Sequence, residues 1–74
     1  MNPLQRARIK RILDKTAEYR MAQGGPGARD PYHYAAADMY EDGPMIAAEI
    51  SGPGEQVTAA EVIAEVKRLM GARP

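Results

Sequence analysis

Residues 57–71, VTAAEVIAEVKRLMG, decide the fold, because every local signal in this stretch predicts one amphipathic helix. Thr58 and Glu61 have the spacing of a capping box, in which each side chain accepts a hydrogen bond from the other residue's backbone N–H. Val57 is placed to pack on Val62, one turn into the helix. Apolar residues recur at steps of three and four and therefore share one face: Ala59, Val62, Ile63, Val66, Leu69 and Met70. This face needs an apolar partner, which the rest of the chain must supply.

The N-terminal part of the chain predicts a second long helix, over about residues 3–22. Asn2 and Pro3 form a typical start, since Asn caps a helix and Pro fits its first turn. Apolar residues again recur at helical spacing along this segment. We expect the two helices to pack through Ile9, Ile12 and Leu13 on one side and Val62, Ile63, Val66 and Leu69 on the other.

Two stretches rich in Gly and Pro, residues 23–29 and 51–56, predict flexible loops. Between them, residues 31–41 follow a helical apolar spacing and predict a short helix. Residues 44–51, PMIAAEIS, are ambiguous, because their composition favours a short helix but their apolar residues also alternate as in a single strand. We therefore predict an all-α fold, a small bundle of three to four short helices in one domain of residues 1–74, with an α+β fold as the alternative.

The composition limits the environment and the chemistry of the protein. The 74 residues include no Cys, which excludes disulfides and thiolate metal sites. No apolar run approaches the roughly 20 residues needed to cross a bilayer, and no apolar signal segment follows the charged N-terminal residues. We therefore expect a cytoplasmic protein that does not bind a membrane. Large apolar residues are few, and Phe and Trp are absent, so a thin core favours docking on a larger partner or assembly into a homo-oligomer.

The charges are segregated along the chain, although their sum is zero. Residues 1–29 contain seven Lys or Arg and two acids, whereas residues 30–65 contain eight acids and no Lys or Arg. Such asymmetry is a clue to binding partners, although the acids could also fold back and neutralise the basic helix. We expect partner contacts from the basic helix face and from a tyrosine–acid segment: Arg6, Lys10, Arg11, Tyr34, Asp38, Glu41 and Asp42.

Residues with catalytic or ligand-binding potential are few and scattered. The chain has one His, His33, and one Ser, Ser51, and no spacing links them to an orienting acid. The spacings of a phosphate-binding loop and of a calcium-binding EF-hand are also missing. We therefore predict no enzymatic activity, no catalytic residue, no cofactor and no metal site.

These observations predict a non-enzymatic protein-binding module that acts as a regulator, inhibitor or accessory subunit of a larger protein assembly. Small proteins of this size and chemistry often have such roles, and some of them are virus-encoded proteins that block host machinery. The alternative is a nucleic-acid-binding protein that uses the basic N-terminal helix, although the zero net charge argues against it.

Overall fold

The computed structural model describes residues 1–52 and 54–73, and these residues form five α-helices and no strand. The helices are α1 (Pro3–Gln23), α2 (Pro26–Arg29), α3 (Pro31–Glu41), α4 (Gly43–Ser51) and α5 (Ala59–Gly71). The predicted all-α fold is confirmed. The alternative strand over residues 44–51 is wrong, because these residues belong to α4.

The helix count exceeds the predicted three to four, because the first Gly/Pro stretch contains a helix of its own. The sequence predicts a loop over residues 23–29, but the last four of these residues form α2, which begins with a well-placed Pro. A Cβ on Gly27 would lie 3.4 Å from the Arg20 side chain, so this helical turn packs closely on α1. The second predicted loop, residues 51–56, starts at the last residue of α4, and its residue 53 lies outside the described residues.

Capping boxes define where the two longest helices, α1 and α5, begin. At α1 the Asn2 side chain accepts a hydrogen bond from the Gln5 N–H over 2.8 Å, and Gln5 Oε1 accepts one from the Asn2 N–H over 3.0 Å. Thr58 and Glu61 form the reciprocal pair at α5, as predicted, with distances of 3.2 and 3.0 Å. Each cap stabilises its helix by about 1 kcal/mol.

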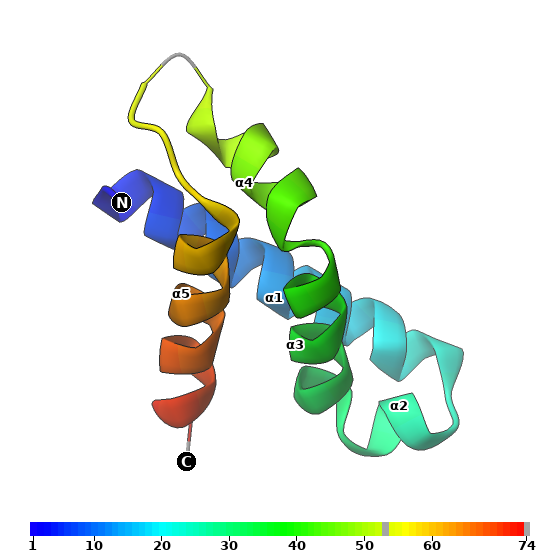
Figure 1. Cartoon of the computed structure of the whole chain (residues 1–74). Coiled ribbons are helices and arrows are strands. Elements are labelled where there is room, and N and C mark those ends of the chain that lie inside the picture. The colour runs from blue at the N-terminus through cyan, green and yellow to red at the C-terminus, as the bar shows by residue number, and fades with distance from the viewer. Residues whose placement is uncertain (53, 74) are drawn as a thin grey trace.

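The longest helix, α1, forms the base of the molecule, and α3 and α5 lie side by side across it (Figure 1). α4 follows α3 almost directly and packs on both α5 and α1. A Cβ on Gly43, the first residue of α4, would lie 3.5 Å from the Ile63 side chain, so the start of α4 closely approaches α5. Three helices therefore cover one side of α1, while the other side of α1 faces solvent.

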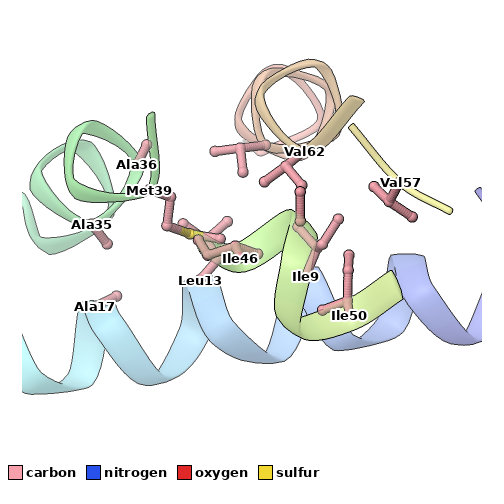
Figure 2. Packing of buried hydrophobic residues seen from close by; sticks show 12 residues of the cluster. Ile9, Leu13, Ala17, Ala35, Ala36, Met39, Ile46, Ile50, Val57 and Val62 are labelled. Carbon is pink, nitrogen blue, oxygen red and sulfur yellow. The ribbon is translucent and has the colours of Figure 1, made fainter. Parts of the chain in front are cut away.

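The core lies where α1 meets α3, α4 and α5 (Figure 2). Ile9 and Leu13 of α1, Met39 of α3, and Val62 and Val66 of α5 have the largest fully buried side chains. The predicted packing of the N-terminal helix on the C-terminal helix is therefore confirmed. Three members of the predicted contact set are only partly buried: Ile12, Ile63 and Leu69. Alanines fill much of the remaining core, namely Ala17, Ala35, Ala36 and Ala47.

Candidate functional site

Arg6 and Lys10, two of the residues expected to contact a partner, form ion pairs within the chain. Arg6 Nη1 lies 3.1 Å from Glu65 Oε1, and Lys10 Nζ lies 2.8 Å from Asp14 Oδ2. Hydrogen bonds from Lys10 and, to a smaller extent, from the Tyr32 hydroxyl lower the pKa of Asp14. Both basic groups are therefore partly neutralised by the chain itself.

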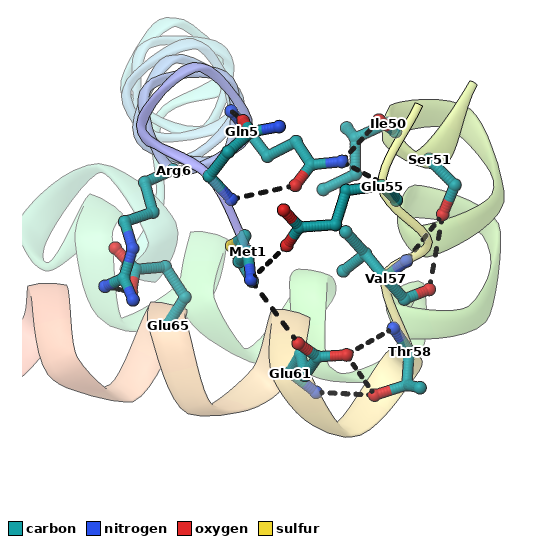
Figure 3. A network of polar contacts seen from close by, with 11 residues as sticks. Met1, Gln5, Arg6, Ile50, Ser51, Glu55, Val57, Thr58, Glu61 and Glu65 are labelled. Atoms are coloured by element: carbon teal, nitrogen blue, oxygen red, sulfur yellow. Dashed lines mark hydrogen bonds and ion pairs between the residues drawn. The ribbon is translucent and has the colours of Figure 1, made fainter. Parts of the chain in front are cut away.

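Glu65 carries a charge although its side chain is only 5% exposed. Its carboxylate accepts hydrogen bonds from Arg68 Nε over 3.0 Å and Arg68 Nη2 over 2.6 Å. It also accepts one from Arg6 across the interface between α1 and α5 (Figure 3). The hydrogen bonds from Arg68 are the main reason why the pKa of Glu65 is lowered. Glu65 therefore joins α5 to α1, a role that the sequence did not predict.

Tyr34 and Asp38, on one face of α3, gather around Arg20 of α1. Arg20 Nε and Nη2 donate to the two carboxylate oxygens of Asp38 over 2.9 and 2.7 Å. The guanidinium carbon of Arg20 also lies 5.6 Å from the centre of the Tyr34 ring. Glu41 and Asp42, at the end of α3, are exposed. The structure thus brings Tyr34 and Asp38 together in an intrachain contact and leaves Glu41 and Asp42 open to solvent.

Arg11, the remaining predicted cation, lines a groove between α1 and α4. The groove has a volume of about 420 Å³ and is lined by Arg8, Arg11, Ile12, Lys15 and Thr16 of α1 and by Glu49 of α4. Within the described residues, neither Arg8 nor Arg11 forms an ion pair. Lys15 has a 3.6 Å contact with Glu18, and both side chains are about two-thirds exposed. Within the part of the chain that the structure describes, Arg8 and Arg11 are therefore the cations of this groove without an ion-pair partner.

Two large exposed apolar side chains belong to the same two helices. Leu4 is 70% exposed and lies one turn before Arg8 on α1, and Met45 is 62% exposed and lies one turn before Glu49 on α4. Leu4 lies beside Ile50 and Ser51 at the end of α4, and Met45 lies near the start of α4, so these two side chains flank the groove at its two ends. We define the α1–α4 surface as Leu4, Arg8, Arg11, Ile12, Lys15 and Thr16 of α1 together with Met45 and Glu49 of α4.

Of the cations on the α1–α4 surface, only Arg11 was predicted from the sequence, and Arg8 and Lys15 were missed. The signal that could have found them is their spacing, because steps of three and four place all three residues along one line of a helix. Leu4 continues this line one turn earlier. The contribution of α4 leaves no comparable trace in the sequence, because it depends on how the chain folds back.

Polar contacts hold the segment between α4 and α5 against the start of α1 (Figure 3). Gln5 is only 4% exposed, and its Nε2 donates to the Glu55 carbonyl over 2.6 Å and to the Ile50 carbonyl over 3.4 Å. The buried Ser51 hydroxyl accepts a hydrogen bond from the Val57 N–H over 2.9 Å. These bonds position α4 relative to α1 and so maintain the shape of the groove between them.

The remaining polar residues offer little further chemistry. His33 is exposed and packs edge-on against the Tyr34 ring, with 5.5 Å between the ring centres. Within residues 1–52 and 54–73, no group of three or more His, Cys, Asp or Glu side chains is placed to hold a metal ion. No helix in this described part of the chain has the length and apolar character needed to cross a membrane.

No protein-family model, curated protein or solved structure matches the chain.

Proposed function

We propose that the protein is a non-enzymatic protein-binding module that acts as a regulator, inhibitor or accessory subunit of a larger protein assembly. It would bind this assembly through the α1–α4 surface. The observation that supports this most directly is the combination of exposed Leu4 and Met45 with the unneutralised cations Arg8 and Arg11. Protein interfaces are enriched in Met and Arg, and Arg is among the residues that most often carry a large share of the binding energy. The cations would steer an acidic partner, and the apolar side chains would be buried on docking.

Glu41 and Asp42 are a second contact that we propose for the same partner. Both are exposed at the end of α3. By contrast, Arg6, Lys10 and Asp38, which the sequence also suggested, have intrachain ion pairs that a partner would need to replace. We therefore place the main binding energy on the α1–α4 surface and assign Glu41 and Asp42 a steering role.

Affinity capture from cell extract tests this proposal through a matched pair of variants. Arg8→Glu/Arg11→Glu reverses two charges on the α1–α4 surface, whereas Arg29→Glu/Lys67→Glu makes the same change in net charge at exposed residues of α2 and α5. We expect the wild type and the control variant to retain a common set of proteins, identified by mass spectrometry, that the first variant loses. Full retention by Arg8→Glu/Arg11→Glu would remove the α1–α4 surface as the binding site.

Nucleic-acid binding is the second candidate function, and the line of Arg8, Arg11 and Lys15 on α1 is the observation that favours it. Glu49 in the same groove would repel a phosphate backbone, and exposed Leu4 would gain little from it. Titration of labelled DNA and RNA at low salt tests this alternative. A complex whose affinity falls steeply and linearly with salt on a log–log plot would favour it over a protein partner.

A further inference from the structure

The α1–α4 surface is elongated and lies between two helices, a geometry suited to a third helix. Helices pack their side chains into the grooves between neighbouring helices at axis separations of about 8–10 Å. From Leu4 to Thr16 the surface extends over about 18 Å of α1, at roughly 1.5 Å per residue. This length corresponds to about three turns of a bound helix, and an amphipathic helix in an apolar groove is a common mode of recognition.

The charges of the groove are arranged on opposite sides. Arg8, Arg11 and Lys15 lie along α1 within about two helical turns, roughly 10 Å, whereas Glu49 lies on the α4 side. Ile12 lines the groove between them and is partly buried. A helix seated here would meet positive charge along one edge, the apolar side chain of Ile12 in the middle and the negative charge of Glu49 at the other edge.

We propose that the α1–α4 surface binds an amphipathic helix of a partner protein whose charge pattern is complementary to the groove. The bound helix has Asp or Glu at about one-turn intervals along the edge that faces α1. Its central stripe is apolar and packs on Ile12, and Lys or Arg on its other edge faces Glu49. Further apolar residues of the bound helix contact Leu4, which continues the cation line of α1, and Met45, one turn before Glu49 on α4. This inference rests on the proposed function, since it names the partner chemistry of the same surface.

Selection from a phage-displayed library of helical peptides tests the inference without assuming a partner sequence. The peptides span about four turns and are randomised at all positions. They are selected on wild-type protein, on Arg8→Glu/Arg11→Glu and on a surface without protein. We expect the wild type to enrich peptides with acidic residues along one edge of an apolar stripe and basic residues along the other. We expect Arg8→Glu/Arg11→Glu to enrich basic residues in place of the acidic edge.

The affinity of the best selected peptide provides the quantitative readout, measured by fluorescence anisotropy. Reversing the charges of Arg8 and Arg11 should weaken this peptide by at least about tenfold, because like charges then face each other. Arg29→Glu/Lys67→Glu should leave the affinity unchanged, and the circular dichroism of both variants confirms that they fold. Amide shifts caused by the peptide should map to Leu4, Ile12 and Met45.

Several results would overturn the inference. These are enrichment of peptides without an acidic edge, enrichment of acidic peptides without helical periodicity, and no enrichment above the surface without protein. Sedimentation that reveals a homodimer abolished by Arg8→Glu/Arg11→Glu would instead assign the groove to a second copy of the chain.

The capture experiment separates this inference from the proposed function. If the capture of proteins from cell extract depends on Arg8 and Arg11 but the selected peptides lack the charge pattern, only the helix inference is overturned. Capture that does not depend on these residues would overturn the proposed function even if acidic helices were selected.

Discussion

Replacing Gln5 by alanine should lower the free energy of unfolding by roughly 2–4 kcal/mol, a large effect for a polar residue near the N-terminus. The Gln5 side chain donates to two carbonyl groups, those of Glu55 and Ile50, and accepts a hydrogen bond from the Asn2 N–H. Each such bond contributes about 0.5–1.5 kcal/mol, and a buried carbonyl left without a donor adds a desolvation cost.

The expected loss is a substantial fraction of the total stability. At about 0.05–0.15 kcal/mol per residue, a chain of this length is stable by roughly 4–11 kcal/mol. A change of 1 kcal/mol shifts the melting temperature of a small domain by about 4–8 °C. Gln5→Ala should therefore lower the melting temperature by at least about 8 °C.

Urea unfolding followed by circular dichroism measures this effect, with Gln23→Ala as the matched control. Gln23 is exposed at the other end of α1, and its side chain donates to the Tyr19 hydroxyl. Loss of the Gln23 side chain should lower the free energy of unfolding by less than about 0.5 kcal/mol. Gln5→Glu adds a second comparison, because it keeps an acceptor for the Asn2 N–H but at neutral pH has no proton to donate to Glu55. Equal unfolding midpoints for Gln5→Ala and Gln23→Ala would refute the structural role of Gln5.

Three further predictions concern the core, a buried charge and a turn. Leu13→Ala should cost about 2–5 kcal/mol in urea unfolding because it opens a cavity, whereas Leu4→Ala, at an exposed site, should cost less than about 0.5 kcal/mol. The pKa of Glu65 is lowered mainly by Arg68, so its stabilising effect is fully present above its ordinary pKa of 4.5 and is lost as pH falls through the lower folded-state value. The stability advantage of wild type over Glu65→Gln, measured by urea unfolding, should therefore shrink as the pH falls below the ordinary pKa of 4.5. An advantage independent of pH would contradict this. Gly52 has a φ of +53°, so Gly52→Ala should lower stability by about 1 kcal/mol, which a thermal melt would detect.

The sequence predicted well those parts of the fold that depend on local interactions. The capping box of Thr58 and Glu61 and the Asn2–Pro3 start depend only on residues a few positions apart, and both define helix ends in the structure. The bounds of the helix predicted over residues 31–41 agree with α3. The loop predicted at residues 23–29 was partly wrong, because the pattern of Gly and Pro does not reveal that Gly27 packs on α1 and supports a helical turn.

The burial of polar residues could not be predicted, because it depends on contacts between distant segments. Nothing in the local sequence distinguishes Gln5 from an exposed helix residue, but the return of the chain after α4 covers it. Glu65 reads as an exposed acid on α5, but the crossing of α1 brings Arg6 onto it. The crossing pairs Arg6 with Glu65, and Lys10 pairs with Asp14 within α1, so the candidate site moves from Arg6 and Lys10 toward Arg8.

Site-specific photocrosslinking tests the central claim, that the α1–α4 surface binds a partner protein, most directly. A photoreactive residue is placed at Leu4 or Met45 within the surface, or at exposed Ala60 on α5 as the control. The proposal predicts crosslinks in cells from positions 4 and 45 to the same protein, and none from position 60. Crosslinking that is equally strong from position 60, or absent from positions 4 and 45, would contradict it.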